Sequence, residues 1–102
     1  FFYFPAINEA YLSKIDLKSF ATFQAEVLET IGGFYDLTHL PGLSNDLTRS
    51  VDFHHLDSQA VATSLKHLDE SMYVDSRNKM EANFQTYQSI RQHIISNVFS
   101  LP

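Results

Sequence analysis

Residues 6–31 contain neither Gly nor Pro, and this uninterrupted stretch restricts the fold more than any other feature. Pro5 suits the first position of a helix, because its ring fixes φ and it has no amide hydrogen to satisfy. Gly32 and Gly33 follow the stretch and make a natural C-terminal stop. The sequence therefore predicts one helix, or two in succession, over Pro5–Ile31.

Within this stretch the apolar residues change sides. At about 100° per residue they form two groups, whose faces lie about 170° apart on a common helical wheel. The first group is Ile7, Tyr11 and Ile15, and the second is Phe20, Phe23, Val27, Ile31 and Phe34. Either the helix ends near Asp16, which then caps a second helix, or one long helix is buried on opposite faces at its two ends. Both interpretations give the first turns a contact surface of their own.

Two further helices are expected in the second half of the chain. The first runs from Ser58 to about Glu70, with Asp57 as its N-cap, and the second from about Ser76 to Phe99. A break near residues 74–76 separates their apolar stripes, and a continuous helix over residues 57–99 is the alternative. The stripes consist of Val61, Leu65, Leu68 and Met72, and of Met80, Phe84, Tyr87, Ile94 and Val98.

The segment between residues 34 and 57 is irregular but apolar, which indicates a packed connection. Residues 38–42 are typical of a turn, and residues 44–46 suit the cap of a short helix.

No alternation of period two persists anywhere in the chain, so no strand is expected. The predicted fold is all-α, a small helical bundle or orthogonal array of four to five helices. Residues 1–102 are expected to form a single helical domain, cut from a larger protein because no Met begins the sequence.

Charge and composition narrow the possible partners. The net charge is −5, and the seven Lys and Arg residues are scattered, which argues against binding to nucleic acid. The longest apolar run, residues 1–7, is too short to span a membrane, so membrane attachment is expected only through a removed N-terminal segment. Cysteine is absent, which excludes disulfides and thiolate chemistry.

No motif predicts catalysis, a metal site or a cofactor. His54 and His55 lie near Asp52, Asp57 and His67, but their spacing does not match the Glu-x-x-His pattern of helical metal sites. We therefore expect no enzyme activity, no catalytic residue, no metal ligand and no cofactor.

Excess apolar surface is the remaining signal. Phe1, Phe2, Tyr3 and Phe4 come in addition to the helical stripes. These aromatic residues either fold back over one end of the bundle or meet another chain. The sequence favours a non-catalytic protein–protein interaction or oligomerisation module of a larger protein, which binds a protein partner or a second copy of itself. The expected anchors are Phe4, Ile7, Tyr11 and Ile15.

The alternative function is an extracytoplasmic helical sensor domain of a membrane receptor, which would bind a ligand. The aromatic residues at the start would then be the end of a transmembrane helix. A two-pass sensor of this kind needs both of its ends on the side that faces the membrane.

Overall fold

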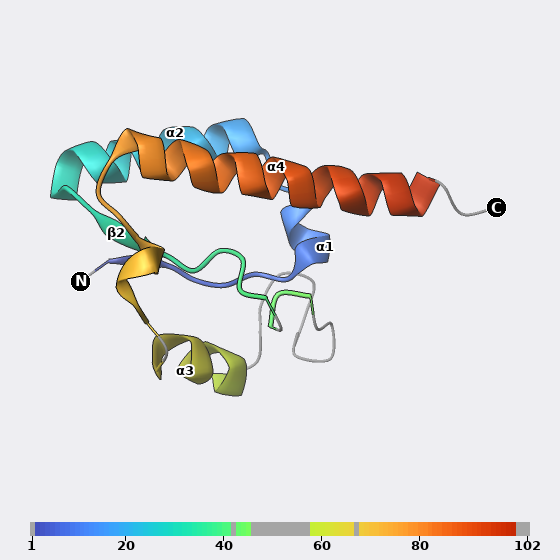
Figure 1. Ribbon diagram of the computed structural model, residues 1–102, viewed down its shortest axis with the longest axis horizontal. Coiled ribbons are helices and arrows are strands. Elements are labelled where there is room, and N and C mark those ends of the chain that lie inside the picture. The colour runs from blue at the N-terminus through green and yellow to red at the C-terminus, as the bar shows by residue number, and fades with distance from the viewer. Residues whose placement is uncertain (1, 42, 46–57, 67, 100–102) are drawn as a thin grey trace.

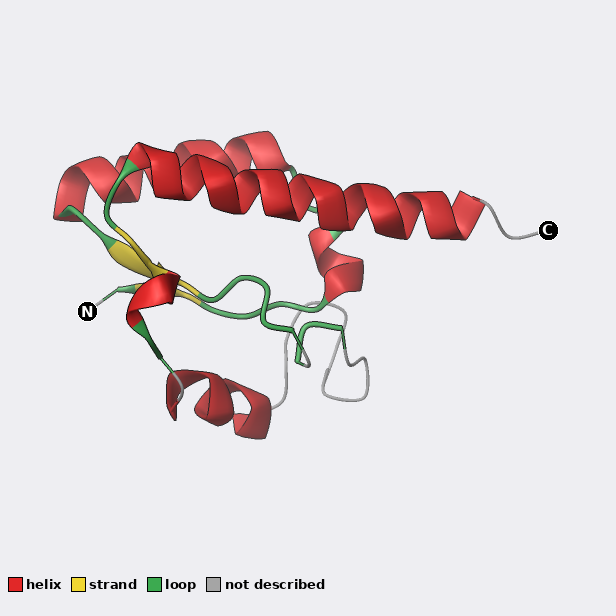
Figure 2. Ribbon diagram, viewed as in Figure 1, coloured by secondary structure: helices red, strands yellow, loops and turns green. Residues whose placement is uncertain are grey.

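The computed structural model describes residues 2–41, 43–45, 58–66 and 68–99. These residues form a mixed α/β structure (Figures 1 and 2). The elements, in chain order, are β1 (Tyr3–Phe4), α1 (Glu9–Leu12), α2 (Leu17–Ile31), β2 (Phe34–Asp36), α3 (Ser58–Lys66), the 3-10 helix η2 (Glu70–Met72), β3 (Tyr73–Val74) and α4 (Arg77–Phe99).

The three short strands form one sheet with β2 in the centre. Strand β1 is parallel to β2, with Tyr3 opposite Tyr35, whereas β3 is antiparallel to β2, with Phe34 opposite Val74. The prediction of an all-α fold is therefore wrong. Strands of two or three residues are too short to show alternation in the sequence, because one period already spans two residues.

Helices α2 and α4 lie side by side, in opposite directions, over one face of the sheet (Figure 1). Phe34 and Val74 belong to the core cluster on this face, together with Met80, Phe84 and Tyr87 of α4. The burial of these three α4 residues agrees with the stripe expected for the last helix. Helix α3 lies apart from α2 and α4, and its Ala60 packs in a smaller cluster with Ala6.

Phe4 lies in the middle of the aromatic part of the core. Its ring contacts four other phenylalanine rings edge to face, at centroid distances of 5.0–5.7 Å. The four are Phe2, Phe20, Phe23 and Phe34. Edge-to-face pairs of this kind stabilise a core beyond the area that they bury. Tyr3 and Phe4 thus form a strand of the sheet, and Phe4 is part of the core.

Several predicted helix ends are confirmed. The side chain of Asp16 caps α2 by accepting hydrogen bonds from the amides of Lys18 and Ser19. Hydrogen bonds from the Ser19 hydroxyl and amide lower the pKa of Asp16. Gly32 ends α2 with φ of 84°, a left-handed conformation that glycine adopts without strain. Ser76 precedes α4, and its hydroxyl accepts from the amide of Lys79.

One helix start and one helix end differ from expectation. The helix predicted from Pro5 begins at Glu9. Tyr3 and Phe4 pair with β2 as a strand, and the side chain of Asn8 caps the helix by accepting a 2.7 Å hydrogen bond from the Tyr11 amide. The helix predicted to reach Glu70 ends at Lys66. The expected Asp57 cap and the expected short helix after residue 46 lie outside the described residues.

A buried carboxylate joins the sheet to α4. Asp36 is only 7% exposed, and its Oδ2 accepts hydrogen bonds from the Tyr87 hydroxyl at 2.7 Å and from Asn83 Nδ2 at 3.2 Å. Its Oδ1 accepts from the amide and the hydroxyl of Thr38. A carboxylate removed from water needs such donors, because an unpaired buried charge is strongly destabilising.

We predict that Tyr87→Phe lowers the free energy of unfolding at neutral pH by about 1.5–3 kcal/mol, the usual worth of a hydrogen bond to a charged group. Burial first, and then the charge of Asp36, raise the pKa of Tyr87 in the folded state. The unfolded chain therefore loses this proton first, and stability present below about pH 10 is lost as the pH rises further. Urea titrations at neutral and alkaline pH should show a shallower alkaline decline for Tyr87→Phe. Identical declines in both proteins would contradict this account.

Gln24 is also buried and polar, but its side-chain amide lacks hydrogen-bond partners among the described residues. Its side chain is 0% exposed on the inner side of α2, and neither amide atom has a hydrogen-bond partner among the described residues. We expect Gln24→Leu to raise the free energy of unfolding by about 1–3 kcal/mol, because the desolvated amide is removed. Thermal unfolding measures this change, and a lower melting temperature for Gln24→Leu would show that the amide is satisfied after all.

Candidate functional site

An apolar cavity of about 290 Å³ opens beside α1. Its lining consists of Phe4, Pro5, Ile7, Tyr11, Ile15, Phe20 and Thr38. All four anchors expected from the sequence belong to this set, so the fold brings them together around one space. A cavity of about 150 Å³ already accommodates benzene, so this one is large enough for an apolar side chain.

The four anchors differ in how much of each remains accessible. Phe4 is buried and forms part of the core, whereas Ile7, Tyr11 and Ile15 are half-buried. Ile7 and Ile15 also pack against the core cluster. Phe4 therefore contributes to the cavity as a fixed wall, and the other three keep surface that a bound group could cover.

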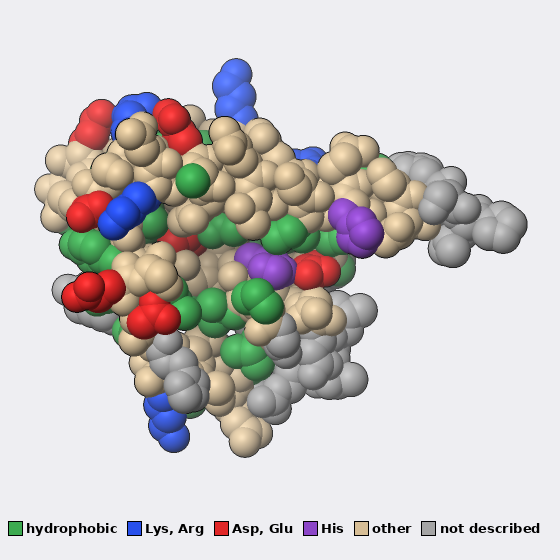
Figure 3. Space-filling view, viewed as in Figure 1, with side chains coloured by type: hydrophobic (Ala, Val, Ile, Leu, Met, Phe, Trp, Pro, Cys, Tyr) green, Lys and Arg blue, Asp and Glu red, His purple; other side chains and the backbone are tan. Residues whose placement is uncertain are grey.

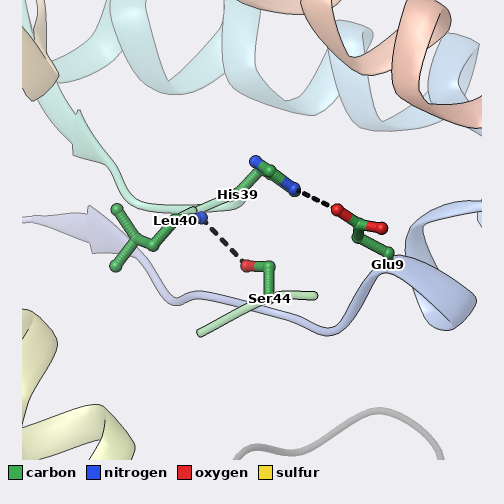
Figure 4. A network of polar contacts seen from close by, with 4 residues as sticks. All are labelled: Glu9, His39, Leu40 and Ser44. Atoms are coloured by element: carbon green, nitrogen blue, oxygen red, sulfur yellow. Dashed lines mark hydrogen bonds and ion pairs between the residues drawn. The ribbon is translucent and has the colours of Figure 1, made fainter. Parts of the chain in front are cut away.

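Hydrogen bonds fix the segment before α1 to the loop after β2. The amide of Ile7 donates to the carbonyl of Thr38 at 3.0 Å, and the amide of Glu9 donates to the carbonyl of Ser44 at 2.8 Å. Figure 4 shows the side-chain contacts beside them. His39 Nε2 lies 2.9 Å from Glu9 Oε1, and the Ser44 hydroxyl accepts from the amide of Leu40 at 2.9 Å.

The last helix is hydrogen-bonded to the segment between α1 and α2. The guanidinium of Arg91 on α4 donates to the carbonyl of Ile15 at 3.0 Å. The described segments that line this open cavity are thus each hydrogen-bonded to a neighbouring segment. Preformed, rigid sites bind with a smaller entropic cost than sites that must first become ordered.

The chemistry of the lining suits an apolar group. Among the described residues that line the cavity, none carries a charge at neutral pH, and the hydroxyl of Thr38 already donates to Asp36. In the described part of the chain, no group of three or more His, Asp or Glu residues could hold a metal ion. His54, His55 and His67, considered above as metal ligands, lie outside it.

A second surface was missed by the sequence analysis. Phe23 and Ile31, expected in the buried stripe of α2, are 51% and 52% exposed, and Phe2 beside them is 41% exposed. The buried residues of α2 are Leu17 and Gln24. A glutamine on the inner side conceals which face of the helix is buried, because hydrophobic patterning assigns such a residue to the solvent side.

The chain matches no family model, no curated protein and no solved structure. Among the helices that the structure describes, none combines the length and the apolar character that crossing a membrane requires. The geometry of these two surfaces is therefore the basis for inferring a function.

We predict that Ser44→Ala lowers the free energy of unfolding by about 1–2 kcal/mol, because the Leu40 amide loses its acceptor inside the protein. Ser64→Ala is the matched control: Ser64 is also buried, but its hydroxyl only adds a second donor to the carbonyl of Ala60 within α3. Urea titrations of both variants measure the difference. Equal losses would show that the Ser44 bond does not hold the loop in place.

Proposed function

We propose that this chain is a non-catalytic protein–protein interaction or oligomerisation module of a larger protein. Its mechanism is the insertion of an apolar side chain of the partner into the cavity beside α1. The observation that supports this proposal is the preformed apolar cavity, which is lined by Ile7, Tyr11 and Ile15 with Phe4 behind them.

The size and lining of the cavity explain why an apolar side chain is the expected occupant. A leucine side chain or a phenyl ring fits within about 290 Å³. Each methylene group transferred from water contributes about 0.8 kcal/mol, and a well-buried anchor residue contributes ~2 kcal/mol or more to an interface. One such residue is enough to direct a specific contact, since few residues carry most of the energy of an interface.

The alternative, a ligand-binding sensor domain of a membrane receptor, requires both ends of the domain on one side. Strand β1 and the last turn of α4 lie toward opposite ends of the molecule (Figure 1). This arrangement favours the interaction module over a two-pass sensor.

Toluene, the side chain of phenylalanine in isolation, provides a direct test of the cavity. We expect toluene to shift the methyl NMR signals of Ile7 and Ile15 but not those of Leu65, which is exposed on α3 and does not line the cavity. Ile7→Phe should narrow the cavity and reduce the shift of Ile15, with little effect on the melting temperature. Equal shifts at Leu65, or an unchanged response in Ile7→Phe, would contradict the assignment.

Sedimentation equilibrium over a wide concentration range then tests oligomerisation through this cavity. If the partner is a second copy, the wild-type chain should associate and Ile7→Phe should remain monomeric. Association that persists in Ile7→Phe would place the contact elsewhere. A wild-type chain that stays monomeric would assign the cavity to a different protein.

A further inference from the structure

Three hollows join into one band across the surface that the sequence analysis missed. The hollow on the outer side of α2 shares Phe2 and Ile31 with a second hollow, which lies over the sheet. The second hollow shares Tyr35 and Tyr73 with a third, at the start of α4. We call this continuous surface the β1–α4 band. It is separate from the cavity beside α1, because none of the described residues lines both.

One end of the band is apolar. Phe2, Phe23 and Ile31 are three of the four large hydrophobic residues that are exposed in the described part of the chain, and all three line this end together with Val27. Scattered exposed apolar residues are ordinary, but their gathering in one place marks a surface that binds another molecule.

The middle of the band is aromatic. The rings of Tyr35 and Tyr73 meet edge to face at a centroid distance of 5.0 Å, on the side of the sheet away from α2 and α4. Gly33 makes room for them, because a Cβ atom at this position would lie 2.2 Å from the Tyr73 hydroxyl oxygen. The glycine thus permits the Tyr73 ring to lie close against the sheet.

The other end of the band is acidic. Glu70 and Asp75 line the third hollow with the two tyrosines, and Lys79 is the only cation among the described residues that line it. Lys79 already pairs with Asp75 at 3.2 Å, whereas Glu70 has no ion pair among the described residues. Acidic side chains gather in this region, over η2 and the start of α4 (Figure 3). Tyrosine rings beside a free carboxylate suit a guanidinium or ammonium group.

We propose that the β1–α4 band binds a peptide segment of another protein that carries an apolar residue at one end and a basic residue at the other. The apolar residue covers Phe23 and Ile31, and the basic residue lies against the tyrosine rings and pairs with Glu70. Charge complementarity selects this occupant over a second copy, because the chain has a net charge of −5 and Glu26 also lines the apolar end. The proposal does not rest on the function assigned to the cavity beside α1.

A phage-displayed library of random dodecapeptides tests this inference on the intact chain. We expect the enriched peptides to combine Leu, Ile or Phe with Arg or Lys several residues away. Ile31→Gln and Glu70→Lys should each weaken the binding of an enriched synthetic peptide at least about tenfold. Ile31 and Glu70 are both exposed, so these variants should fold.

Leu65→Gln and Glu81→Lys are the matched controls. They make the same changes in polarity and charge at exposed positions on α3 and α4 that do not line the band. They should leave the affinity of the peptide within about twofold of the wild type. Failure to enrich any peptide, enrichment of peptides without a basic residue, or equal losses in the control variants would each overturn the proposal. Binding that Ile7→Phe abolishes would instead place the peptide in the cavity beside α1.

Discussion

The pairing of β1 with β2 is the constraint on which the rest of this structure depends. It places Phe4 among four other phenylalanine rings, next to the helices that cover the sheet. The segment that contains this strand reaches both candidate binding surfaces, because Phe4 forms a wall of the cavity beside α1 and Phe2, which directly precedes β1, lines the β1–α4 band. Loss of the pairing would therefore remove part of the core and part of each surface at once.

Polar groups inside the molecule fix how the layers meet. Asp36 at the end of β2 accepts hydrogen bonds from Asn83 and Tyr87 of α4, which sets the position of this helix on the sheet. The loop that follows β2 is hydrogen-bonded to the segment at the start of α1. The position of β2 therefore also determines where two walls of the cavity lie. Gln24 is the exception, since its buried side-chain amide has no hydrogen-bond partner among the described residues and so links no two elements of the fold.

Local signals in the sequence predict local features well. Asp16 and Gly32 mark the ends of α2 because a cap and a left-handed turn each depend on one residue type at one position. The change of apolar face near Asp16 coincides with the start of α2, but it does not separate two environments, since Ile7 and Ile15 pack against the same core cluster as Phe20 and Val27 of α2. The sheet could not be predicted, because its strands are very short and are joined by contacts between residues far apart in the chain. The exposure of Phe23 and Ile31 was missed for the same kind of reason, since it depends on which side of α2 the sheet and α4 cover.

Amide hydrogen exchange at Tyr35 and Leu37 tests the central claim most directly, namely that β1 is an integral strand. These amides donate to the carbonyls of Phe2 and Phe4, each at 3.0 Å, and these bonds exist only if β1 lies against β2. The structure predicts that both amides exchange as slowly as core amides in the middle of α2 and α4. Exchange of Tyr35 and Leu37 at the rate of unprotected amides, while the helices remain protected, would contradict the strand and both surfaces built upon it.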